Sequence, residues 1–135
     1  MDERVRSIVT DLRSKSSSEA ADWLMKHYPV GSTGAGEAIT IVQHLSWKKS
    51  DQTRLAEYYL SGIPFASARP YEVFASFMQT RRLVDIMRKH IPNNDRKQLL
   101  EYHAGPVLTR AAKTPEDHEA VQSFLAEVRR DQYSG

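Results

Sequence analysis

The chain has 135 residues, of which 40% are hydrophobic and 27% are charged, a size and composition typical of one compact globular domain. A formal net charge of only +2 is weaker than that of a committed nucleic-acid binder, which concentrates positive charge more strongly. The chain contains no cysteine, which excludes a disulfide framework, a thiolate zinc site and a cysteine nucleophile.

The N-terminal part of the chain predicts two helices. The first carries its apolar residues at the i, i+3, i+4 and i+7 spacing of one helix face: Val5, Ile8, Val9 and Leu12. Ser16 and Glu19 then fit a capping box, in which each side chain satisfies a backbone N–H at a helix start. The second helix should end before Pro29, and the two helices form a predicted hairpin over residues 3–29.

The next segment, residues 31–36, is rich in glycine. It lacks the Lys–Ser/Thr pair of a phosphate-binding loop and no strand precedes it, so we predict a turn. A second hairpin is expected over residues 35–64. Its second helix is capped by Ser50 or Asp51 and ends at the glycine and proline that follow.

A third hairpin is expected over residues 70–110. Pro70 suits the first position of a helix, because its missing N–H has no partner there in any case. The apolar face continues as far as residue 91, but the polar stretch 79–82 interrupts it. Residues 70–91 could therefore form one long helix or two shorter ones.

The last two predicted helices differ in how clearly they begin. Asn94 or Asp95 should cap the first of them, and the Gly–Pro pair at 105–106 should break or kink it. Residues 114–117 combine an N-cap threonine, a proline and two acidic side chains. They predict the start of a C-terminal capping helix over residues 115–130.

No segment shows convincing strand alternation, so the predicted fold class is all-α. We expect about six to eight helices arranged as stacked hairpins. They would form a short right-handed helical repeat or a bundle-like single domain over residues 1–135.

An acidic residue followed by an aromatic residue recurs three times, each time before a proline. The three pairs, called the acidic–aromatic triplet below, are Asp22–Trp23, Glu57–Tyr58 and Glu101–Tyr102. The acidic residues are 35 and then 44 positions apart. Such periods are typical of arrays of helical hairpins, because each hairpin must stack on the next to bury its apolar face.

The second and third pairs belong to a longer echo within the chain. Its matching residues are Asp51, Leu55, Glu57 and Tyr58 against Asp95, Leu99, Glu101 and Tyr102. On these residues the chain resembles a short helical-repeat protein of the HEAT or armadillo type, over roughly residues 17–110. The resemblance implies a protein-binding scaffold and transfers no catalytic residues, while a helical bundle with accidental similarity is the alternative.

Two interpretations of the acidic–aromatic triplet are open. If the hairpins stack in register, the three carboxylates and their rings form one ridge suited to a basic protein surface. In the other interpretation, which we favour, the aromatic rings pack between hairpins and the acids make local helix pairs. The expected local pairs are Asp22 with Lys26, Arg54 with Glu57, and Lys97 with Glu101.

A group of basic residues offers an alternative function in binding nucleic acid. Its members are Arg81, Arg82, Arg88, Lys89, His90, Arg96 and Lys97. Asp85 and Asp95 dilute this positive charge, and no RNA-binding or zinc-finger signature accompanies it. A solvated helix face is the more common role of such a group, so we expect nucleic-acid binding to be the less favoured function.

No catalytic, metal or cofactor site is predicted. The five histidines are His27, His44, His90, His103 and His118, and none of them forms H-E-x-x-H. No serine lies in G-x-S-x-G, although a carboxylate pair that converges only in space stays possible. A small helical enzyme without a recognisable motif is therefore the third hypothesis.

The leading hypothesis is a non-catalytic protein that neutralises or regulates another protein. In size, and in its lack of catalytic signatures, the chain is similar in type to small bacterial immunity proteins, which implies a toxin domain with a basic cleft as partner. Its surface would be the acidic–aromatic triplet. The charged start at residues 1–4 is followed by no secretory segment, and no apolar run could span a membrane, so we expect a cytoplasmic location.

Overall fold

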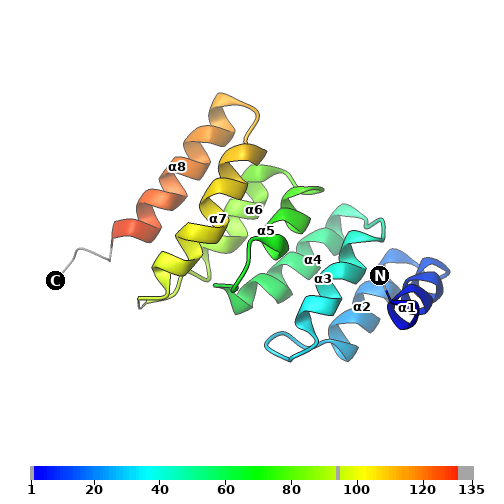
Figure 1. The fold of residues 1–135 in the computed structure, drawn as a ribbon. Coiled ribbons are helices and arrows are strands. Elements are labelled where there is room, and N and C mark those ends of the chain that lie inside the picture. The colour runs from blue at the N-terminus through cyan, green and yellow to red at the C-terminus, as the bar shows by residue number, and fades with distance from the viewer. Residues whose placement is uncertain (1, 94, 131–135) are drawn as a thin grey trace. The chain divides into compact units, whose positions relative to one another are not determined.

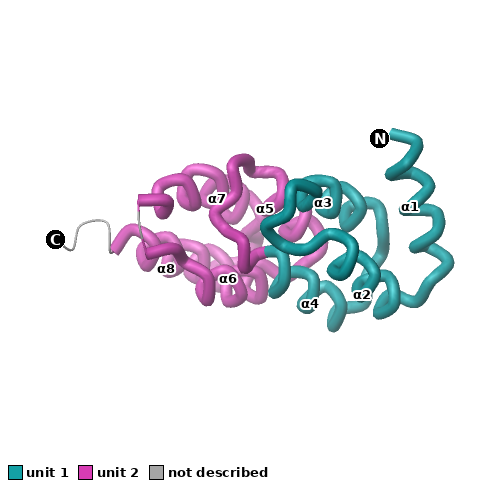
Figure 2. The backbone as a smooth tube through the Cα atoms, turned by 90° about the horizontal axis from the view of Figure 1, so that it is seen from below, with its two compact units in different colours: residues 1–59 teal, residues 60–135 magenta. Residues whose placement is uncertain are grey.

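The computed structural model describes residues 2–93 and 95–130, and all of its regular structure is helical (Figure 1). The described ranges contain eight α-helices, one short 3-10 helix and no strand, which confirms the predicted all-α class. None of the described helices combines the length and the apolar character needed to cross a membrane. The chain divides into two compact units, residues 1–59 (unit 1) and residues 60–135 (unit 2) (Figure 2).

Unit 1 is built from four helices that pack as alternating pairs. They are α1 (Glu3–Arg13), α2 (Ser17–His27), α3 (Ala35–Gln43) and α4 (Lys49–Tyr59). The main contacts are those of α1 with α3 and of α2 with α4. The large side chains that fill the core of this unit are Leu24, Ile41, Leu55 and Tyr59. Burying such a side chain contributes about 1.5–3 kcal/mol, so these residues hold the helix pairs together.

The helix starts of unit 1 follow the predicted caps in one case and depart from them in another. The side chain of Ser16 accepts a hydrogen bond from the backbone N–H of Glu19 over 3.1 Å, which confirms the predicted cap of α2. The expected cap of α4 by Ser50 or Asp51 is wrong, because α4 already begins at Lys49. Asp51 lies in the first helical turn, where its carboxylate accepts a hydrogen bond from Arg54.

The glycine-rich connection between α2 and α3 is a turn, as predicted, and tyrosines hold it in place. The hydroxyl of Tyr59 donates to the carbonyl of Tyr28 over 2.9 Å, and the hydroxyl of Tyr58 accepts from the backbone N–H of Val30 over 3.0 Å. Gly31 has a φ of 82°, a left-handed conformation that favours glycine. The turn is thereby attached to α4, which follows it in the sequence.

Unit 2 contains the remaining helices. They are the 3-10 helix η1 (Leu60–Gly62), α5 (Arg69–Ala75), α6 (Thr80–Arg88), α7 (Lys97–Ala111) and α8 (Pro115–Arg130). Helix α8 packs on α6 and α7, and α5 packs on α7 and α6. The large, fully buried side chains of this unit are Leu60, Tyr71, Phe74, Leu83, Met87, Leu100, Leu108 and Phe124.

The structure resolves the question left open for residues 70–91, which form the two helices α5 and α6. Gln79 is the N-cap of α6 and has an extended backbone, with φ −63° and ψ 135°, that no continuous helix could contain. Thr80 is buried at the start of α6, and its hydroxyl donates to the carbonyl of Ala111 at the end of α7. The polar stretch in the sequence therefore marks a helix boundary.

The ends of α7 and α8 test three more predictions. Asn94 lies outside the described residues, and Asp95 does not cap α7, whose N-cap is Arg96. Of the two outcomes expected at the Gly–Pro pair, a break or a kink, the break is wrong, because α7 continues through Pro106 as far as Ala111. Packing of α7 against α5 and α8 outweighs the lost backbone hydrogen bond. The start of α8 is as predicted, with Thr114 accepting from the N–H of Asp117 over 3.1 Å.

Two buried tyrosines predict how stability depends on pH. Burial raises the pKa of Tyr71 to about 12 and raises the pKa of Tyr59 well above that of an exposed phenol. Because folding raises these pKa values, their contribution to stability is complete below about pH 10, the pKa of an unfolded tyrosine. It is lost as the pH rises toward the folded values.

We therefore expect the free energy of unfolding, measured by urea denaturation, to be lower at about pH 11 than at about pH 8. In the Tyr71→Phe variant this difference should be smaller, because one of the two titrating phenols is gone. Equal pH dependence in the variant and the wild type would contradict the assignment to Tyr71.

Candidate functional site

Tyr102 stands out on the surface of unit 2. Within residues 2–93 and 95–130 it is the one large hydrophobic side chain that is exposed, with 75% of its surface accessible. It lies on α7, and its ring meets the ring of His103 edge to face at a centroid distance of 5.0 Å. An exposed aromatic ring with a polar hydroxyl is a frequent anchor in protein–protein contacts.

A groove of about 1000 Å³ runs beside Tyr102 on α7 and α8. Its apolar lining comes from Pro106, Val107 and Leu125, among others, and its charged lining from Glu101, Arg110 and Arg129. The lining residues of α8 are Gln122, Leu125 and Arg129, whose spacing places them on one helix face. The groove is mixed in polarity and wide, which suits a segment of another protein better than a small molecule.

Glu101, the third acidic residue of the triplet, is held by the neighbouring helix. Arg129 on α8 donates from Nε to the carboxylate of Glu101, so this ion pair joins α8 to α7 along the groove. This contact comes from another helix, whereas the pair expected from the sequence is a local one with Lys97 on α7 itself. Lys97 is only 2% exposed, at the start of α7.

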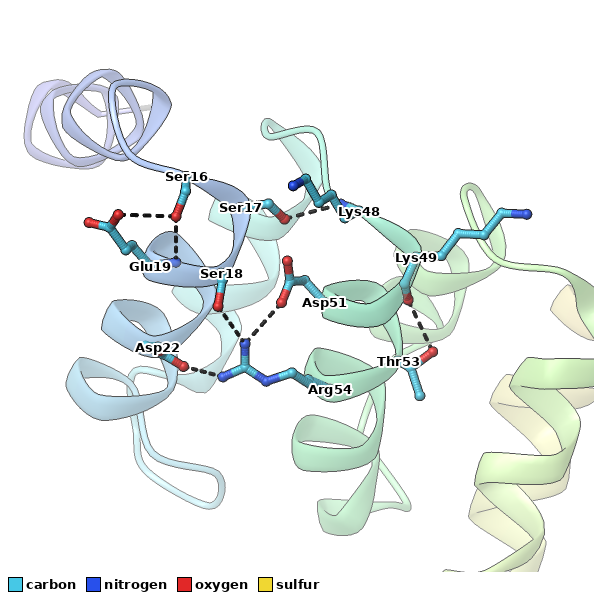
Figure 3. A network of polar contacts seen from close by, with 10 residues as sticks. All are labelled: Ser16, Ser17, Ser18, Glu19, Asp22, Lys48, Lys49, Asp51, Thr53 and Arg54. Carbon is cyan, nitrogen blue, oxygen red and sulfur yellow. Dashed lines mark hydrogen bonds and ion pairs between the residues drawn. The ribbon is translucent and has the colours of Figure 1, made fainter.

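Asp22, the first acidic residue of the triplet, is also held from another helix. Arg54 on α4 bonds to Asp22 on α2 through one guanidinium nitrogen and to Asp51 over 2.9 Å through the other (Figure 3). The same guanidinium lies 3.4 Å from the hydroxyl of Ser18. The hydrogen bonds that Arg54 donates to the carboxylates of Asp22 and Asp51 raise the pKa of Arg54, which keeps it positively charged between the two helices.

The two aromatic residues of the triplet in unit 1 mainly make contacts within the fold. Trp23 is half-buried and stacks on His27 with ring centroids 4.0 Å apart. Tyr58 is half-buried, packs edge-on against Tyr59, and uses its hydroxyl in the turn described above. Glu57 is also half-buried and directly precedes Tyr58 on α4. Of the three rings in the triplet, Tyr102 alone is exposed.

The three copies of the motif lie on three different helices. Asp22 lies on α2 and Glu57 on α4, and these two helices pack together in unit 1. Glu101 lies on α7, which packs with α5 and α8 in unit 2.

Two arginines of the basic group around residues 81–97 form ion pairs with acidic residues. Arg88 contacts Asp85 over 3.3 Å and Glu127 on α8 over 2.7 Å, and Arg81 lies 3.5 Å from Asp117. Lys97 is buried and cannot belong to a solvent-exposed face. The positive charge of the basic group is thus partly neutralised by Asp85 on the same helix and by Asp117 and Glu127 on α8.

Residues for metal or cofactor chemistry are not assembled in the described part of the chain, where no group of three or more His, Asp or Glu side chains could hold a metal ion. The chain matches no family model, no curated protein sequence and no solved structure at a significant level. The function is therefore argued from the groove and its residues.

The pairing of Arg88 makes a prediction about nucleic acid. Replacing both partners, in the Asp85→Asn/Glu127→Gln variant, removes two negative charges and releases the guanidinium. Affinity for a short single-stranded oligonucleotide at low salt should then rise several-fold, by roughly the effect of adding two or three phosphate contacts. Fluorescence anisotropy measures this change. An unchanged affinity would mean that Arg88 is not available to phosphates even when its partners are removed.

Proposed function

We propose that this chain is a non-catalytic, cytoplasmic protein-binding domain that neutralises or regulates another protein through the groove on α7 and α8. The observation that carries the proposal is the 75% exposure of Tyr102 at the edge of that groove. Tyrosine is enriched among the few residues that provide most of the energy of protein–protein contacts. A ring kept this exposed is better explained by a partner than by the fold.

The polar groups of the groove indicate what the partner segment should carry. Arg129 is paired with Glu101, whereas Arg110 makes no side-chain bond within the described residues. Pro106 has no N–H, so the helical hydrogen bond to the carbonyl of Tyr102 is missing. An apolar segment with one acidic side chain for Arg110 and one donor for this carbonyl would fit.

An immunity protein that blocks a bacterial toxin is the most concrete form of the proposal. Such a protein acts by covering the partner's active site and needs no catalytic groups of its own. The basic cleft expected of the partner would meet Glu101 on the lining of the groove, where this carboxylate already contacts Arg129. The apolar contact at Tyr102 would determine how slowly the complex dissociates.

The proposal predicts that Tyr102→Ala weakens partner binding without affecting the fold. The partner is first captured from the native host with the wild-type chain, identified and purified. Its dissociation constant should then rise by about tenfold or more with the variant, mainly through a faster off-rate. The melting temperature should change little, because the ring is exposed.

His118→Ala is a matched control for this experiment. His118 is exposed on α8 in the same unit and does not line the groove. It should leave the affinity unchanged. Equal affinity of the wild type and Tyr102→Ala would remove the groove from the mechanism. If the purified partner is a toxin, co-expression should restore growth with the wild type and less so with Tyr102→Ala.

The acidic residues of the triplet make a separate prediction. Replacing Asp22, Glu57 and Glu101 together by alanine should slow association with a basic partner and reduce affinity less than Tyr102→Ala does, because charges outside the apolar contact act mainly on encounter. Stopped-flow kinetics at two salt concentrations measures the effect. If the association rate and its salt dependence stay unchanged, these acids have no part in recognition.

A further inference from the structure

Unit 1 contains a second hollow, smaller and more polar than the groove of unit 2. It lies where the α1–α2 connection meets the α3–α4 connection and has a volume of about 320 Å³. The residues that line it are Leu12, Arg13, Lys15, Ser17, Ala20, His44, Leu45, Ser46 and Trp47. Its volume is at the lower end of the range for small-molecule pockets, about 300–1000 Å³.

The hollow is surrounded by positive charge that the protein does not neutralise. The cationic side chains on its lining and in the adjoining first turn of α4 are Arg13, Lys15, Lys48 and Lys49, and all four are exposed. None of them is in an ion pair within the part of the chain that the structure describes. This contrasts with Arg4, Arg54, Arg81, Arg88 and Arg129, which all contact carboxylates.

The carboxylates of Glu19, Asp22 and Asp51 on α2 and α4 are already engaged elsewhere, and Asp11 on α1 is exposed and does not line the hollow. Asp22 and Asp51 accept from Arg54, and the carboxylate of Glu19 contacts the hydroxyl of Ser16 over 3.2 Å (Figure 3). No carboxylate is among the residues that line the hollow. The positive charges around it are therefore available to an external anion.

Hydrogen-bond donors also remain unused in the hollow. The hydroxyl of Ser17 accepts from the backbone N–H of Lys48 over 3.0 Å, which leaves its own proton to donate. Nδ1 of His44 lies 2.8 Å from the carbonyl of Thr40, so Nδ1 is the donor in this bond and Nε2 of the neutral ring adds no donor for an anion. Arg13 uses only one nitrogen, which donates to the carbonyl of His44 over 3.2 Å.

We propose that this hollow binds a phosphoryl group of a small soluble ligand. An oxyanion with several negative oxygens is the chemical group that an arginine, a lysine and a serine hydroxyl recognise together through charge-assisted hydrogen bonds. Lys15 supplies a point charge and Arg13 the remaining donors of its guanidinium, while Ser17 donates from the start of α2. Lys48 and Lys49 add positive charge at the rim. The site lies in unit 1 and is independent of the partner groove in unit 2.

The test is a titration of the whole chain with inorganic phosphate at constant ionic strength, followed by amide NMR. We expect saturable shifts at Lys15, Ser17 and Ser46. Lys15→Glu should weaken binding about tenfold or more, because it places a negative charge at the phosphate. Lys15 is exposed and its side chain makes no hydrogen bond or ion pair within the described residues, so this variant should fold as the wild type does.

Lys26→Glu is the matched control, because it makes the same charge change on an exposed residue of α2 outside the hollow. It should change the affinity less than about twofold if the effect is local. Shifts that do not saturate, or equal losses in the two variants, would overturn the proposal. A short single-stranded oligonucleotide forms the second arm. Saturable binding of the oligonucleotide without saturable binding of phosphate would also overturn the site for a small ligand.

Discussion

One guanidinium group organises the charges of unit 1. Arg54 extends from α4 and contacts Asp51 on its own helix and Asp22 on α2, next to Ser18 (Figure 3). Asp51 is only 3% exposed, and a buried carboxylate is tolerated when it is paired and hydrogen-bonded. By engaging these two acids, Arg54 also leaves the lysines at the start of α4 without carboxylate partners.

Ion pairs also distinguish the two surfaces that we consider functional. In unit 2 the Arg129–Glu101 pair joins α8 to α7 and leaves Tyr102 and Arg110 facing the groove. In unit 1, Asp22 and Asp51 pair with Arg54, and the cations around Lys15 have no carboxylate partner within the described residues. The first surface suits an apolar protein segment and the second an anion, so the two proposals rest on different residues and can fail separately.

Much of the fold could be predicted from local patterns, because caps and helix periods depend on neighbours in sequence. The caps at Ser16 and Thr114 are correct for that reason. The predicted break at Pro106 and the predicted cap at Asp51 are wrong. Helix packing outweighs the tendency of Pro106 to end a helix, and the carboxylate of Asp51 is in an ion pair with Arg54. Tyr102 is among the site residues predicted from the sequence. The groove beside it is not, because it depends on which face of α8 packs on α7, and a single sequence does not reveal that.

The central claim is that Arg54 stabilises unit 1 through the buried Asp51. A double-mutant cycle with Asp51→Ala, Arg54→Ala and the double variant tests it directly, using urea denaturation near neutral pH. We expect a coupling free energy of about 1–3 kcal/mol, because Arg54→Ala leaves the buried carboxylate of Asp51 without its counterpart, whereas in Asp51→Ala the guanidinium keeps Asp22. Additive effects within about 0.5 kcal/mol would contradict it, and would mean that the pair only accompanies the packing of α2 on α4.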